Sequence, residues 1–89
     1  MGIEYTVYIW QEGDQFVAHA MPLNVMSSGK TVDEARKALG EAVHLFLKTA
    51  EEIGTLEEVL EEWGYEFRDG KWISHPWISI ERHFTVVGA

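Results

Sequence analysis

Three carboxylates fall in separate predicted elements, which is the arrangement that a two-metal nuclease would need to bring acidic groups together. Glu4 lies in the first predicted strand, Glu41 in a long predicted helix and Glu81 in the last predicted strand. Glu41 belongs to the polar face of its helix, which points away from the sheet, so its carboxylate should not meet that of Glu4. We therefore predict no catalytic residues and no enzymatic activity.

The histidines show no metal-binding spacing such as His-Glu-x-x-His. Of the four, His19 and His83 fall on predicted strands and could meet on one sheet face, although a strand histidine is more often a packed or surface residue. The chain has no cysteine, which excludes disulfides, thiolate-bound zinc and iron–sulfur clusters. It also has no P-loop or dinucleotide fingerprint. We predict no metal site and no cofactor.

The most unusual segment is acidic. From Glu51 to Glu66 there are seven carboxylates and no Lys or Arg. One interpretation is a solvated face, in which Glu57 and Glu58 stabilise a helix N-terminus. The other is a docking surface for a cationic partner, because like charges four residues apart on a helix repel each other and gain from a facing positive surface. On this interpretation the partner-binding residues are Glu57, Glu58, Glu61 and Glu62.

Composition narrows the class of protein. The 89 residues form a single domain, 1–89, whose 46% hydrophobic and 12% aromatic content predicts a folded chain. A formal net charge of −8 repels nucleic acid and suits a basic protein partner. We see no signal peptide and no apolar run long enough to span a membrane, and we expect a cytoplasmic protein without membrane contact.

Apolar alternation predicts the strands. The segment from Ile3 to Trp10 reads as one strand inside a sheet, and a Gly13-Asp14 turn leads into a second strand from Gln15 to Ala20. A third strand follows over Val25 to Ser28. Residues 77–87 alternate again and predict a long final strand, which we expect to lie parallel to the first.

Capping residues predict two helices between these strands. Thr31 and Glu34 have the spacing of a capping box and open a long amphipathic helix that ends before Gly54. Thr55 and Glu58 form a second such pair, which opens a short helix ending near Gly64. Asp69-Gly70 is a strong hairpin signal between Tyr65 and Ser74. The expected fold class is α+β: three antiparallel strands, a long helix, a short helix and C-terminal strands, with the helix on one sheet face.

Several of these motifs together resemble the HicB-like antitoxin family. The first is Gly13 to Ala18 followed by Met21-Pro22, and the second is Gly29-Lys30-Thr31-Val32-Asp33-Glu34-Ala35 at the helix start. The stretch from Gly54 to Tyr65 is similar to a longer subgroup of that family. Two departures are visible: the family's Pro-x-Leu-Pro-Gly loop reads Pro22-Leu23-Asn24 here, and the DNA-binding module of full antitoxins has no counterpart after Val87.

The resemblance implies a partial RNase H-like sheet and an antitoxin domain that binds and occludes a small basic ribonuclease toxin of a type II toxin–antitoxin pair. The alternative is an orphan domain without a toxin, acting as a homo-oligomeric scaffold or binding a small ligand. The domain alone should not contact nucleic acid. We expect a homodimer or higher oligomer, because the four tryptophans and the apolar sheet faces exceed what one helix stripe covers. These tryptophans are Trp10, Trp63, Trp72 and Trp77.

Overall fold

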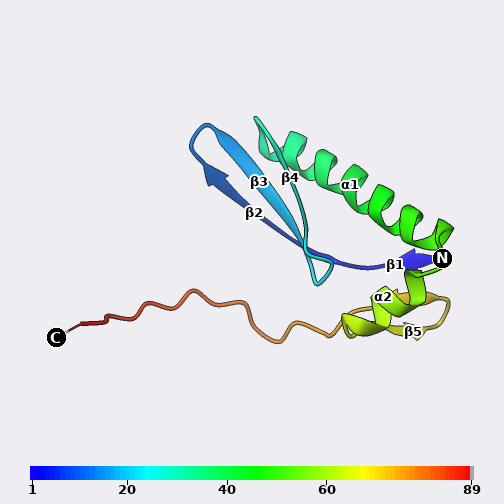
Figure 1. Ribbon diagram of the computed structural model, residues 1–89. Coiled ribbons are helices and arrows are strands. Elements are labelled where there is room, and N and C mark those ends of the chain that lie inside the picture. Colours follow the sequence, from blue (N-terminus) through cyan, green and yellow to red (C-terminus); the bar gives the residue numbers. More distant parts are fainter. Residues whose placement is uncertain (89) are drawn as a thin grey trace.

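A computed structural model describes residues 1–88 as two small sheets, two helices and an extended C-terminal segment (Figure 1). The strands and helices follow in the order β1 Gly2–Ile3, β2 Thr6–Glu12, β3 Gln15–Met21, β4 Val25–Gly29, α1 Val32–Glu52, α2 Leu56–Glu62, β5 Glu66–Arg68 and β6 Lys71–Ile73. The α+β class predicted from the sequence is therefore confirmed.

The larger sheet is an antiparallel meander in the order β2-β3-β4. Its first turn has only Gly13 and Asp14 between the paired residues Glu12 and Gln15, and Gly13 adopts a φ of 61°. A two-residue hairpin with glycine at a left-handed position matches the twist of the flanking strands. The second turn places Leu23 in the core, at 1% exposure.

The predicted first strand is in fact two strands. β1 and β2 lie in different sheets and are separated by Glu4 and Tyr5. The prediction that this segment lies inside a sheet was wrong, because β2 is hydrogen-bonded to β3 alone and forms an edge of the larger sheet. Val7 and Ile9 face the helix side and pair with the buried Ala20 and Ala18. Apolar residues on both faces toward the end of the segment had suggested a central strand.

Helix α1 crosses the face of the larger sheet and packs mainly on β3 and β4 (Figure 1). Thr31 caps its N-terminus by accepting a 3.0 Å hydrogen bond from the backbone N–H of Glu34. The Glu34 carboxylate accepts in return from the backbone N–H of Lys30, one residue before the expected position. Both bonds satisfy free donors at the helix start. The buried face of the helix includes Leu39 and Val43.

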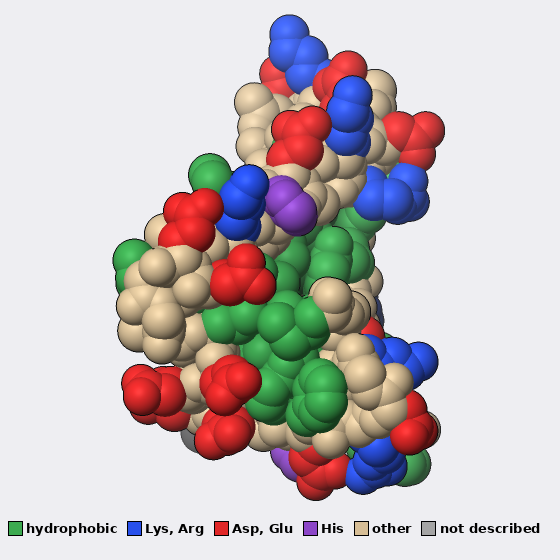
Figure 2. Space-filling view, turned by 90° about the vertical axis from the view of Figure 1, so that its right-hand side faces the viewer, with side chains coloured by type: hydrophobic (Ala, Val, Ile, Leu, Met, Phe, Trp, Pro, Cys, Tyr) green, Lys and Arg blue, Asp and Glu red, His purple; other side chains and the backbone are tan. Residues whose placement is uncertain are grey.

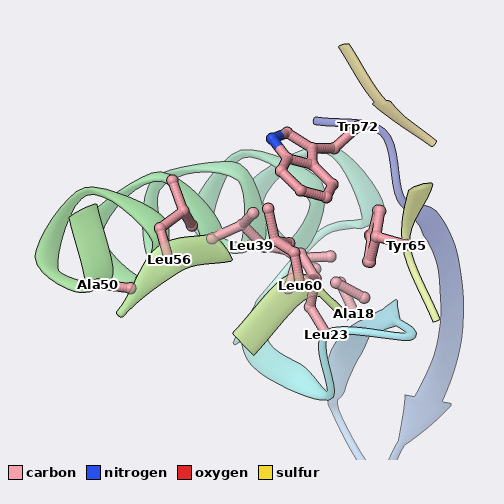
Figure 3. Close-up of a cluster of buried hydrophobic side chains, with 11 residues drawn as sticks. Ala18, Leu23, Leu39, Ala50, Leu56, Leu60, Tyr65 and Trp72 are labelled. Atoms are coloured by element: carbon pink, nitrogen blue, oxygen red, sulfur yellow. The ribbon is translucent and has the colours of Figure 1, made fainter. Parts of the chain in front are cut away.

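Helix α2 contributes Leu56 and Leu60 to the same hydrophobic core as α1. Leu60 is fully buried and lies in the centre of the hydrophobic cluster, close to Leu23 and Leu39 (Figure 3). The predicted second capping box was wrong: the Thr55 side chain does not cap α2, and its hydroxyl lies 3.4 Å from the carbonyl oxygen of Ala50 as a donor. The short helix is stabilised by burial of its apolar side and not by a side-chain cap at its N-terminus.

The predicted Asp69-Gly70 hairpin is confirmed between β5 and β6. Asp69 and Gly70 have φ values of 52° and 82°, as a type I′ turn requires. β6 pairs with β5 on one side and runs parallel to β1 on the other, with Trp72 opposite Ile3. A strand does pair in parallel with the start of the chain, but that strand is β6 and not the predicted strand over residues 77–87.

The long final strand was predicted wrongly. Residues 77–87 pair with no other strand among residues 1–88 and extend away from both sheets (Figure 1). Their apolar side chains are open to solvent, with Ile78 at 93% and Phe84 at 91% exposure. An alternating pattern identifies a segment suited to a sheet, but it does not say which chain supplies the neighbouring strand.

Candidate protein-binding surface

The three carboxylates considered for nuclease chemistry do not converge. Glu4 Oε1 accepts a 3.1 Å hydrogen bond from the backbone N–H of Ser74, whereas Glu41 is exposed on α1. Glu81 lies in the C-terminal segment, where hydrogen bonds from Ser79 and then His83 lower the pKa of its carboxyl. Within residues 1–88, no three His, Asp or Glu side chains are grouped so as to hold a metal ion.

The two strand histidines are also apart. Nε2 of His19 lies 2.7 Å from Oδ1 of Asn24, and the ring is 6.2 Å from those of Tyr8 and Trp10. His83 instead lies 2.8 Å from the Glu81 carboxylate in the exposed segment. His19 therefore belongs to an aromatic group on the outer face of the larger sheet, and the suggested meeting of the two histidines does not occur in the described chain.

The acidic residues predicted for partner binding share one exposed surface of α2. Glu57, Glu58, Glu61 and Glu62 are all exposed. None of them has an ion-pair partner among residues 1–88, where Arg68 pairs with Glu66 and Arg36 with Asp33. Glu61 and Glu62 also lie at the C-terminal end of α2, where negative charge is unfavourable. The four carboxylates thus form an uncompensated negative surface.

An apolar groove adjoins this acidic surface. It lies between α1 and α2, has a volume of about 400 Å³ and is open to solvent. Leu45 and Ile53 on its wall are 66% and 69% exposed, which is unusual for large aliphatic side chains. The groove shares Thr55 and Val59 with a hollow that is otherwise lined by Glu58, Glu61 and Glu62. An apolar strip therefore runs directly into the acidic surface.

Stacked aromatic rings hold the two walls of the groove in place. Phe46 of α1 and Trp63 at the end of α2 stack with ring centroids 5.9 Å apart and an interplanar angle of 16°. Leu56 and Leu60 of α2 are buried in the core, against which Trp63 packs. Because α2 is anchored through these contacts, its acidic face and the groove keep a fixed relation to each other.

Leu45 is the residue of this surface that the sequence reasoning missed. It falls outside the apolar stripe that faces the sheet, between the exposed His44 and the half-buried Phe46. A leucine outside the core-facing stripe was the available signal, since the polar face of a helix rarely carries a large aliphatic residue without a contact. Ile53, the C-cap residue of α1, also lies on the groove wall.

A second hollow lies on the other side of α1, against the N-terminal segment. Its volume is about 500 Å³, and it is lined by residues of the N-terminal segment, by apolar residues of both helices and by His44, Lys48 and Glu51. Figure 2 shows the side of the molecule where the N-terminus and the end of α1 lie, with hydrophobic side chains gathered in a hollow and acidic side chains beside them. The mixed charge around this hollow gives it less preference for a cationic partner than the acidic surface has.

Neither helix in the described part of the chain has the length and apolar character needed to cross a membrane. No family model, no curated protein and no solved structure matches this chain.

Proposed function

We propose that this chain is an antitoxin-like protein that binds and occludes a small basic ribonuclease toxin. The observation that carries the proposal is the acidic surface of α2 beside the apolar groove. A ribonuclease holds the RNA backbone with cationic side chains. A negative surface that docks on those side chains excludes the RNA from them.

The two parts of the surface have different roles in this proposal. The carboxylates of α2 attract the toxin over a distance and set its orientation. The groove between Leu45 and Ile53 receives an apolar side chain of the toxin and slows its release, because burial of apolar area acts mainly on the dissociation rate. Occlusion of this kind requires no catalytic residue on the antitoxin. We place the activity in the cytoplasm.

The proposal extends to the fold. The meander β2-β3-β4 with α1 across one face is the order of elements that a partial RNase H-like domain of the HicB-like family would have. The glycine, threonine and glutamate at the start of α1 support this assignment, since Thr31 and Glu34 both act at the cap.

The test uses a short basic protein encoded next to this chain's gene as the candidate toxin. Changing Glu57, Glu58, Glu61 and Glu62 to Lys should slow association steeply, most of all at low salt, because screening acts over about 10 Å at 0.1 M. A matched control changes four exposed acids elsewhere to Lys, at Glu12, Asp14, Glu41 and Glu52, and alters the net charge equally. Binding kinetics and protection of RNA from cleavage are the measurements.

Three outcomes separate the possibilities. Loss of protection by the α2 variant, with protection kept by the control variant, supports the proposal. Equal effects in both variants would mean that net charge alone matters and would contradict a defined site on α2. Full protection by the α2 variant would show that the acidic face is only solvated.

The exposed C-terminal segment favours a second candidate function, a self-assembling scaffold without a toxin. Its apolar side chains have no partner within the described chain, and a homo-oligomer would bury them. If the neighbouring basic protein neither binds nor is inhibited, and the chain still assembles, the scaffold is the better description.

A further inference from the structure

The C-terminal segment has the side-chain pattern of a strand but no neighbour. Ile78, Ile80, Phe84 and Val86 share one face of this pattern with Arg82 and are 93%, 64%, 91% and 79% exposed. The segment runs straight out from the body (Figure 1). The radius of gyration is 15.6 Å, whereas a compact chain of this length has a value of roughly 12 Å. Such an apolar arm in water is unfavourable by itself.

The outer edge of β2 lacks a neighbouring strand in the described chain. β2 pairs with β3 on one side, and no strand among residues 1–88 occupies its other side. Sheet edges are usually blocked by lysine, proline or a bulge, but β2 reads Thr-Val-Tyr-Ile-Trp-Gln-Glu and carries only a terminal carboxylate. α1 covers β3 and β4 far more than β2, so Val7 on the helix side stays 38% exposed.

We propose that residues 77–87 of one copy form a strand along the free edge of β2 in a second copy, and that the two copies exchange these arms. The apolar side chains of the arm would then extend the helix-side face of the sheet and cover Val7. The exchange leaves no unpaired edge at β2 in either copy, and a two-fold axis closes the assembly as a dimer. This inference specifies how the expected homodimer forms and does not depend on a toxin.

The reach of the arm fits this exchange. β2 has seven residues, which span about 23 Å as a strand. Residues 78–87 can extend to about 33 Å, so the arm can cover β2 with length to spare. The arm also starts beside this edge: the indole N–H of Trp77 donates to the Thr6 hydroxyl, and the Trp77 ring lies 6.2 Å from that of Tyr8. Each arm therefore starts beside β2 of its own copy.

A second copy explains both features better than an unrelated partner does. An unrelated protein that captured the arm would leave the β2 edge unpaired and prone to association. The chain itself does not fold the arm back, because the segment after Trp77 departs from its own β2. Every copy offers one arm and one receiving edge, and a reciprocal exchange uses both.

The full-length chain is tested by light scattering and native mass spectrometry at micromolar concentration. We expect twice the 10.2 kDa mass of one chain. An arm variant, Ile80→Asn with Phe84→Asn, should reduce the mass to that of one chain. Its matched control, Ser79→Asn with Thr85→Asn on the other face of the arm, should stay dimeric. An edge variant, Val7→Lys, should also be monomeric, and Trp10→Lys replaces it if circular dichroism shows that Val7→Lys is unfolded.

Mixing the arm and edge variants is the decisive step. The arm variant keeps an intact edge and the edge variant keeps an intact arm, so together they should give a heterodimer with one exchange restored. A monomeric unmodified chain, or an arm variant that stays dimeric, would overturn the proposal. So would an edge variant that stays dimeric, because the arms would then pair with each other or elsewhere. None of these measurements involves a toxin, so their failure leaves the proposed occlusion to its own test.

Discussion

The hydroxyl of Tyr65 donates a 2.5 Å hydrogen bond to the backbone carbonyl oxygen of Glu4, which lies 61 positions earlier in the chain. Tyr65 follows the end of α2 and is only 4% exposed. Glu4 lies between β1 and β2, where the chain passes from one sheet to the other. The bond therefore ties the acidic helix to the junction of the two sheets.

Removing this hydroxyl should destabilise the fold. We expect Tyr65→Phe to lower the free energy of unfolding by about 1 kcal/mol, because one hydrogen bond is lost while the ring still packs. Urea denaturation followed by tryptophan fluorescence measures the effect. Tyr8→Phe is the control, since Tyr8 lies on the outer face of the larger sheet. Equal stability of the Tyr65 variant and the unmodified chain would show that the bond contributes nothing net.

The same tyrosine should make stability depend on alkaline pH. Burial, followed by the charge of Glu4, raises the pKa of Tyr65 from 10.0 to about 12. The folded state therefore keeps the proton where the unfolded state releases it. The stabilisation is complete below pH 10 and is lost as the pH rises from 10 to about 12. Between pH 10 and about 12, the free energy of unfolding should fall more steeply for the unmodified chain than for Tyr65→Phe. Parallel curves for the two proteins would contradict this prediction.

Substitution of a buried core residue of α2 should strongly reduce the stability of the fold. Leu60 is fully buried at the centre of the cluster in Figure 3. We expect Leu60→Ala to cost 2–5 kcal/mol, because it removes apolar contacts and leaves a cavity. Leu45→Ala is the matched control and should change stability by less than about 0.5 kcal/mol, as Leu45 is 66% exposed. Thermal unfolding separates the two, and a similar loss in both would mean that α2 is not part of the core.

Two threonines at helix starts offer another matched pair. Thr31→Ala should cost about 1 kcal/mol, because its hydroxyl caps the N–H of Glu34. Thr55→Ala should cost less, since Thr55 makes no side-chain cap. Chemical denaturation of both variants measures the difference. A larger loss at Thr55 would reverse the assignment of the caps.

Local signals were sufficient where the partner of a residue lies nearby in sequence. Gly13 and the Asp69-Gly70 pair predicted the two hairpins with two-residue turns correctly, because such a turn needs a left-handed backbone that few residues adopt. Thr31 likewise predicted the start of α1. The Thr55 and Glu58 spacing failed since the same pattern is satisfied by a hydroxyl that turns back to Ala50.

Distant pairing was not predictable from the same signals. The alternation of residues 3–10 does not show that Glu4 and Tyr5 separate two strands, because both pieces continue one period. The alternation of 77–87 predicts a strand but carries no information about its neighbour. The acidic half of the candidate surface was visible as an uncompensated charge run, whereas the groove required the packing of Phe46 on Trp63, which only the tertiary structure shows.

The parallel pairing of β1 with β6 also imposes an order on folding during synthesis. Residues 6–52 make the meander and α1 from contacts close in sequence, so this part can form as soon as it has been translated. Gly2 and Ile3 are translated before this part, yet their partners Lys71 and Trp72 are translated after it. β1 can therefore pair only after residues 71–73 have been translated, and the smaller sheet forms after the larger one.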